Sequence, residues 1–134
     1  MYRKIIVSLS LEHGIGEKAI EVARRLVTKD GTIIGVHVYE PMPGSASAYV
    51  SKEAVARAYN SMKQALEDRV APWPDVEGVM LKGHSGRAIV DYAEEVGADC
   101  IIVGSHKPGM RDIFLGSTAA RIVRHAQCSV HVLR

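Results

Sequence analysis

Apolar residues follow two different patterns along the chain, and the two patterns alternate. Short runs rich in β-branched residues, such as the one at 5–9, are typical of strands buried on both faces. Other stretches repeat an apolar residue every three or four positions, as between Ile15 and Val27, which is typical of amphipathic helices. Strands are therefore predicted at 5–9, 32–39, 76–81, 99–103 and 128–133, and helices at 15–27, 54–70, 88–96 and 116–126.

The predicted elements alternate in the order βαβαβαβαβ. This order favours a five-stranded parallel sheet with right-handed crossovers and helices on both faces, which is the doubly wound, Rossmann-like class of α/β folds. The segment 40–50 is rich in Pro, Gly, Ser and Ala and is expected to be an irregular connection. Because 134 residues suit one domain and no repeat or linker divides them, we expect a single domain over residues 1–134.

The composition excludes some classes of function. Seventeen Lys and Arg residues against fifteen Asp and Glu residues give a formal net charge of +2, whereas nucleic-acid-binding proteins usually carry a strong basic excess. No nucleic-acid partner is therefore expected. The chain has no run of ~18 apolar residues that would span a membrane, and its first apolar run is too short for a signal peptide. We expect a cytoplasmic protein without a membrane partner.

Metal and catalytic motifs are missing from the sequence. Cys100 and Cys128 each open an apolar run and are interpreted as small buried hydrophobes. No CxxC or HExxH motif supports a metal site formed by side chains, and no GxSxG motif supports a serine hydrolase. Ser105 and His106 are neighbours in the chain, and neighbouring side chains tend to point apart, so they do not predict a catalytic pair.

Ligands of doubly wound sheets bind outside the carboxyl ends of the strands, where the strand order reverses. The turns after the first, second and fourth predicted strands are therefore the places to search. Residues 14–19 fit the GxGxxA form of the dinucleotide fingerprint, with Glu40 as a candidate ribose-binding acid. Gly14 does not directly follow the first strand, however, so we favour an ordinary turn that leads into a helix.

Residues 78–85 imitate a phosphate-binding P-loop, with two glycines at the required separation. His84 stands where that motif needs lysine, and 79–81 belong to a predicted strand. We therefore interpret 83–86 as a strand-to-helix turn, with Ser85 as a candidate N-cap.

The turn after the fourth predicted strand carries the strongest signal for phosphate. Gly104 and Ser105 follow the strand directly, and 116–118, with the sequence Gly-Ser-Thr, lead into the last helix. Glycine allows close approach of the backbone, and a helix N-terminus offers unpaired N–H groups. Lys107 and Arg111 add positive charge. The alternative interpretation is a surface loop followed by an ordinary helix cap.

Several segments together resemble the universal stress protein family, and the resemblance extends over essentially the whole chain. The first strand, the end of the second, and the fourth strand with its turn are all similar to family members. The last helix and the last strand are similar as well. The segments that carry the resemblance are 1–7, 37–40, 98–106, 115–119, 122–126 and 129–133.

The resemblance implies binding of ATP, with AMP or ADP as alternatives, and Mg²⁺ with the phosphates. Nucleotide-binding members carry the pattern G-x2-G-x9-G-S/T, whose first glycine and last pair match Gly104 and 116–117, while Lys107 replaces the second glycine and the loop is one residue shorter. The pair Lys107 and Pro108 resembles a subgroup of short bacterial members that has a polar residue and proline there, and this subgroup is also regarded as nucleotide-binding. The implied binding residues are Ser10, where the family usually has Asp, Val38, whose backbone would contact adenine, and, for the phosphates, Gly104, Ser105, His106, Lys107, Gly116, Ser117 and Thr118.

The resemblance also implies a homodimer formed through the last strand, 129–133. This strand would otherwise be an exposed apolar edge, which proteins usually pair or cover. The leading hypothesis is thus an ATP-binding dimeric regulatory module of the stress response. Two alternatives remain: a signalling module of the same fold that binds no nucleotide, and a slow ATPase, for which His106 is the one candidate base near the loop. An enzyme is the less favoured of these classes.

Overall fold

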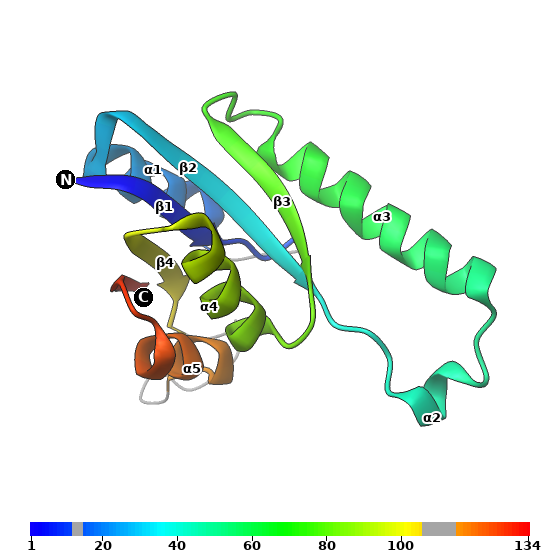
Figure 1. Ribbon diagram of the computed structural model, residues 1–134. Coiled ribbons are helices and arrows are strands. Elements are labelled where there is room, and N and C mark those ends of the chain that lie inside the picture. Colours follow the sequence, from blue (N-terminus) through cyan, green and yellow to red (C-terminus); the bar gives the residue numbers. More distant parts are fainter. Residues whose placement is uncertain (12–14, 106–114) are drawn as a thin grey trace.

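The computed structural model of the protein describes residues 1–11, 15–105 and 115–134, which form a parallel sheet with helices on both faces (Figure 1). The predicted α/β fold with five parallel strands is confirmed. The elements along the chain are β1 (Tyr2–Ser8), α1 (Gly16–Leu26), β2 (Val27–Tyr39), α2 (Gly44–Ser47), α3 (Lys52–Val70), β3 (Val76–Lys82), α4 (Ser85–Val96), β4 (Cys100–Gly104), α5 (Ser117–His125) and β5 (Ser129–Leu133).

The strand order reverses between β1 and β4. The strands lie side by side in the order β3-β2-β1-β4-β5, and each neighbouring pair is parallel. The chain builds outward from β1 to β3 on one side and then crosses to β4 and β5 on the other. The carboxyl ends of β1 and β4 therefore flank the point at which doubly wound sheets bind their ligands.

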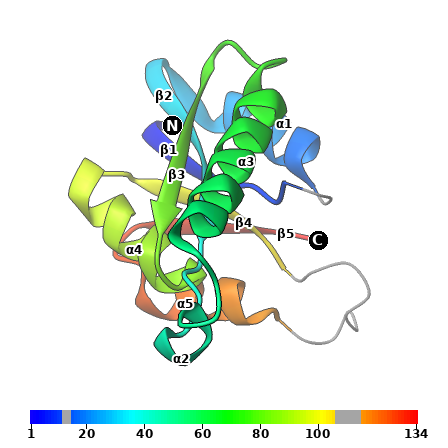
Figure 2. The same ribbon diagram turned by 90° about the vertical axis from the view of Figure 1, so that its right-hand side faces the viewer.

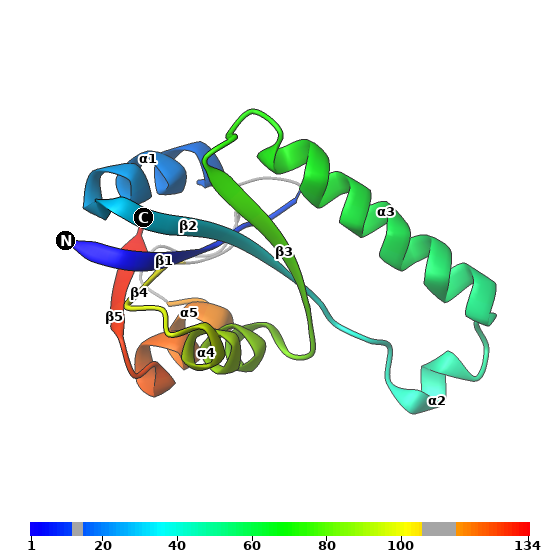
Figure 3. The same cartoon turned by 45° about the horizontal axis from the view of Figure 1, so that its top comes forward.

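Helices α1 and α3 cover one face of the sheet, and α4 and α5 cover the other (Figure 3). The alternation of side chains along β1 supplies both cores. Ile5 and Val7 enter the core beneath α1 and α3, while Ile6 enters the core beneath α4 and α5, and all three are fully buried. Burial of each such side chain contributes roughly 1.5–3 kcal/mol relative to exposure. The need to fill two cores explains why a continuous apolar run marks this central strand.

The structure corrects the predicted boundary between the first helix and the second strand. α1 ends at Leu26, and β2 begins at Val27, whose backbone is extended, rather than at residue 32. Val27 and Thr28 are β-branched, which favours the extended conformation. The register between β1 and β2 shifts opposite this part of β2. Asp30 and Gly31 therefore belong to an irregular start of the strand, and the helix ends before them.

The segment 40–50 contains the short helix α2, where only irregular structure was expected. α3 then begins after Ser51, whose hydroxyl oxygen accepts a hydrogen bond from the N–H of Ala54 at 3.1 Å and so caps the helix. The N-terminal end of α3 lies away from the sheet together with α2 (Figure 1). An edge-to-face contact between Tyr39 and Tyr59, with ring centroids 5.4 Å apart, joins this part of α3 to β2.

Candidate functional site

The end of β4 and the start of α5 lie side by side at the carboxyl edge of the sheet (Figure 2). The N–H of Ser105 donates a hydrogen bond to the carbonyl oxygen of Leu133 at 2.7 Å. The carbonyl oxygen of Ser105 accepts one from the N–H of Gly116 at 2.6 Å. These bonds fix Gly116, the N-cap residue of α5, beside Ser105, which is only 4% exposed.

The N-terminus of α5 presents backbone donors that the described residues do not use. Gly116 offers no capping side chain, and the N–H groups of Ser117, Thr118 and Ala119 meet no acceptor within 1–11, 15–105 and 115–134. The first turn of α5 holds no acidic residue, so no side chain of that turn neutralises the positive end of the helix dipole. Such a helix end suits an anion, and phosphate in particular.

Gly104 allows the start of α1 to approach the end of β4. A Cβ atom at Gly104 would lie 3.2 Å from Cδ1 of Ile15, which is tighter than an ordinary contact. Ile15 is the N-cap residue of α1. The start of α1, at Ile15, and the start of α5, at Gly116, thus both lie next to the end of β4. The two helices cover opposite faces of the sheet, so one begins on each face.

Ser10 and Val38 lie at the neighbouring ends of β1 and β2. Ser10 is exposed and Val38 is half-buried. Leu9 joins the two strand ends, because its N–H donates to the carbonyl oxygen of Val36 at 2.8 Å and its own carbonyl oxygen lies 3.0 Å from Nδ1 of His37. A carbonyl oxygen can only accept, so Nδ1 carries the proton and donates.

Most of the residues that the sequence suggested for binding lie at this edge of the sheet. Gly104, Ser105 and 116–118 come together where β4 meets α5, and Ser10 and Val38 lie at the ends of the next two strands. The sequence did not single out His37, which links these two strand ends. The remaining suggested residues, His106, Lys107, Gly14, Arg111 and Pro108, lie outside the described residues.

Glu40, the candidate ribose acid, is engaged at the start of α4. Its Oε1 accepts hydrogen bonds from the N–H and the hydroxyl of Ser85 at 3.1 and 2.7 Å. The N-cap residue is His84 rather than the predicted Ser85, and the carboxylate of Glu40 supplies the acceptor that a capping side chain would give. Gly83 in this turn has a φ of 131°, so the turn requires glycine for its backbone conformation rather than for a phosphate.

Gly86→Ala is expected to destabilise the protein and displace α5. Gly86 lies in the first turn of α4, where an added Cβ would lie 2.8 Å from Cβ of Arg121 on α5. Since the Cβ of Arg121 is fixed by its own helix, the helices must separate, at a cost of about 1–3 kcal/mol in the free energy of unfolding. Urea unfolding measures this loss. Gly44→Ala is the control, because no atom lies within 4 Å of the added group there, and equal stability of the two variants would contradict the prediction.

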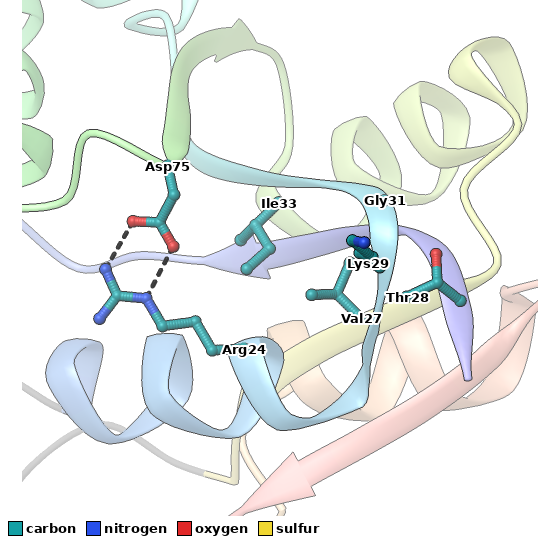
Figure 4. Close-up of a pocket in the computed structure, with 7 residues that line it drawn as sticks. All are labelled: Arg24, Val27, Thr28, Lys29, Gly31, Ile33 and Asp75. Carbon is teal, nitrogen blue, oxygen red and sulfur yellow. Dashed lines mark hydrogen bonds and ion pairs between the residues drawn. The ribbon is translucent and has the colours of Figure 1, made fainter.

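A cavity of about 310 Å³ lies at the amino ends of the strands, away from the candidate site at their carboxyl ends (Figure 4). Arg24 and Asp75 close one side through two hydrogen bonds, from Nε at 2.7 Å and Nη2 at 2.5 Å. The hydrogen bond from Arg24 lowers the pKa of Asp75, so both side chains are charged and satisfy one another near neutral pH. Because this cavity lies at the amino ends of the strands, we assign it no ligand. Its lining residues are Arg24, Val27, Thr28, Lys29, Gly31, Ile33 and Asp75.

Other chemistry finds little support in the described part of the chain. No three His, Cys, Asp or Glu side chains gather there to hold a metal ion. Burial raises the pKa of the Cys100 thiol to about 11 and also raises that of Cys128, so both are protonated at neutral pH and weakly nucleophilic. None of the described helices has the length and apolar character needed to cross a bilayer.

Known proteins resemble this chain over its full length. The sequence model of the universal stress protein family matches residues 1–134. Universal stress protein G of Shigella flexneri is 32% identical over 145 aligned positions, which cover 100% of both chains. Universal stress protein MJ0531 of Methanocaldococcus jannaschii is 29% identical over 146 positions, which cover 100% of this chain and 83% of that protein.

Solved structures of the same fold include several universal stress proteins. The structure of hypothetical protein MJ0577 matches with a TM-score of 0.81 at 24% identity, and the match covers 99% of this chain and 96% of the MJ0577 chain. A universal stress protein in complex with cAMP has a TM-score of 0.67 at 21% identity, covering 99% and 97%. The Archaeoglobus fulgidus protein in complex with dAMP has a TM-score of 0.64 at 22% identity, covering 99% and 98%. With a family model that matches every residue and a full-length relative above 30% identity, this chain belongs to the universal stress protein family.

Proposed function

We propose that the protein binds an adenine nucleotide, with ATP as the principal ligand, and that the nucleotide sets a regulatory state in the stress response. In this proposal the phosphates lie between 104–107 and 116–118. The adenine lies against the backbone of Val38, and Ser10 contacts the ribose. AMP and ADP share the base and ribose contacts, so they are the alternative ligands.

The uncapped N-terminus of α5 is the observation that carries the proposal. Three N–H groups and the hydroxyls of Ser117 and Thr118 lie together at a helix end that Gly116 fixes beside β4. The universal stress proteins solved with cAMP and with dAMP support it, because both ligands combine adenine, a sugar and a phosphate. A site with these donors meets the needs of the phosphate part of such a ligand.

Ser10 makes the ribose contact weaker than an aspartate would. Its hydroxyl can bond to a ribose hydroxyl, but a charge-assisted hydrogen bond is roughly twice as strong as a neutral one. The backbone of Val38 is proposed to contact the adenine, so it does not make up for the weaker hydrogen bond to the ribose. We therefore expect the phosphates to supply most of the binding free energy.

Mg²⁺ accompanies the triphosphate in this proposal. This ion prefers oxygen ligands and usually keeps several waters when it binds with phosphates. The described residues offer no cluster of acidic or histidine side chains for it. In this proposal phosphate oxygens and water supply ligands to the ion, and among the described residues the hydroxyls of Ser117 and Thr118 are the candidate protein ligands.

We also propose a cytoplasmic homodimer of this single domain, 1–134, formed through β5. This strand is an edge of the sheet, and its backbone has β4 on one side only. Its Ser129 and His131 are exposed, whereas Val130 and Val132 are half-buried against the core beneath α4 and α5. Pairing with the same strand of a second copy would cover this edge in a closed two-fold contact.

Calorimetric titration of the folded protein with ATP and Mg²⁺ tests the proposed function. We expect saturable heat, and we expect Gly116→Val to abolish it because a branched side chain at the N-cap blocks close approach of a phosphate. A Gly44→Val variant serves as the control, since residue 44 is exposed and open space surrounds it. No heat above background at millimolar ATP would overturn the proposal. Mass spectrometry of small molecules released on denaturation then identifies the nucleotide that co-purifies.

A further inference from the structure

The main-chain ladder between β1 and β2 ends at a side chain. Ser8 is the last residue of β1 that pairs with β2, opposite Val36, and the N–H of Leu9 still donates to the carbonyl oxygen of Val36 at 2.8 Å. In a parallel ladder the next bond would run from the N–H of Val38 to the carbonyl oxygen of Leu9. That oxygen instead accepts from Nδ1 of His37 at 3.0 Å. A histidine side chain has therefore replaced a main-chain donor.

This replacement leaves the backbone of Val38 open toward the end of β1. Successive residues of a strand point their backbone groups to opposite sides, and the carbonyl oxygen of Tyr39 accepts from the N–H of Gly83 on the β3 side. Val38 therefore faces the β1 side, as Val36 does. No hydrogen bond from the described residues after β1 reaches Val38 there. Its N–H and C=O complement adenine, which presents a ring-nitrogen acceptor beside an amino donor.

We propose that His37 is a positioning residue that keeps the backbone of Val38 available to adenine. It does so by occupying the carbonyl oxygen of Leu9, and it does not itself touch the nucleotide. Without the His37 donor, that oxygen would lack a partner, and the N–H of Val38 is the nearest main-chain replacement. The ladder would then extend by one bond and close the site for the base. This inference rests on the proposed function.

Two substitutions separate the hydrogen bond of His37 from its volume. His37→Phe keeps a ring but removes the donor. His37→Asn keeps a donor, because the amide nitrogen Nδ2 of asparagine is bonded to Cγ, as Nδ1 is in histidine. Amide hydrogen exchange of Val38, followed by NMR without nucleotide, reads the ladder directly. We expect rapid exchange in the wild type and in His37→Asn, and exchange at least about tenfold slower in His37→Phe, because a new hydrogen bond protects the amide. Equal exchange in all three proteins, or a protected amide in the wild type, overturns the inference.

Titration with ATP and with inorganic tripolyphosphate reads the consequence for the base. We expect His37→Phe to lower the affinity for ATP by about tenfold to a hundredfold, from the loss of two hydrogen bonds, and to leave the affinity for tripolyphosphate unchanged. His37→Asn is expected to retain both affinities. An equal loss for both ligands, or no loss for ATP, overturns the inference. A wild-type protein that binds neither ligand overturns the proposed function, and the exchange of Val38 then shows separately whether His37 holds the ladder open.

Discussion

Asp99→Ala is expected to lower the free energy of unfolding by about 3 kcal/mol, since it removes two charge-assisted hydrogen bonds. The carboxylate of Asp99 accepts from the N–H groups of Arg3 and Lys4, both at 2.9 Å, and so ties the start of β1 to the start of β4. Its loss leaves both N–H groups without that acceptor. Urea unfolding followed by the fluorescence of Trp73, which is buried, measures the change.

Asp91→Ala is the matched control for this substitution. Asp91 has a side-chain partner, Nε of Arg87, in place of backbone donors, but the distance is 3.7 Å and both side chains are largely exposed. Its removal is expected to change the free energy of unfolding by less than about 0.5 kcal/mol. Similar losses in the two variants would show that Asp99 contributes no more than a surface charge.

The stabilisation by Asp99 depends on pH. Partial burial alone would raise the pKa of Asp99, but hydrogen bonds from the N–H groups of Arg3 and Lys4 outweigh burial and hold the pKa below its usual value. The unfolded chain therefore binds this proton at a higher pH than the folded protein does. The contribution is complete above about pH 5 and is lost as the pH falls below about 4, through the folded pKa. The difference between wild type and Asp99→Ala must shrink toward acid, and a constant difference from neutral pH to pH ~3 would contradict this assignment.

Ser117→Glu is expected to abolish ATP binding without destabilising the protein. Ser117 is exposed in the first turn of α5, where a carboxylate favours the helix dipole and adds about 0.3–1 kcal/mol to the free energy of unfolding. The same carboxylate occupies the donors proposed for the phosphates and repels their charge. We expect the affinity for ATP to fall at least about a hundredfold in the calorimetric titration.

Ser61→Glu controls for the added charge, because it places a carboxylate on an exposed position of α3, far along the chain from α5. Its affinity for ATP is expected to stay within about twofold of the wild type. If Ser117→Glu binds ATP as tightly as the wild type does, the N-terminus of α5 is not part of the nucleotide site. A large loss of stability in Ser117→Glu would instead mean that Ser117 has a structural role that its exposure does not suggest.

The fold could be predicted because each central element has an unambiguous pattern. A run such as 100–103 is apolar on both faces, and only a strand between two helical layers buries all of it. The start of β2 could not be predicted in the same way. Val27 fits the apolar stripe of α1 by spacing, but in the structure it belongs to β2, where it pairs with Tyr2 of β1. That pairing joins distant parts of the chain and cannot be read from local sequence.

The candidate site was predictable where local sequence determines it. Glycine, serine and threonine at the start of α5 mark a helix end with open donors, and the topology rule brings that end to β4. Contacts between distant residues were not predictable. His37 and the carbonyl group of Leu9 are 28 residues apart, and Glu40 and Ser85 are 45 residues apart. Each pair meets only because β1 and β2 end, and α4 begins, at the carboxyl ends of the strands in the assembled sheet.

The central position of β1 also affects how the protein is made. β1 is synthesised before the other strands, and β2 can pair with it early, followed by β3, which pairs with β2. The other edge of β1 stays open until 100–102 emerge to pair with Ile5, Ile6 and Val7. For most of synthesis the nascent chain therefore carries an unpaired strand edge beside three strongly apolar side chains. Such an edge recruits other nascent chains. We therefore expect the yield of folded protein to depend on competition between completion of the second half of the sheet and aggregation of the first.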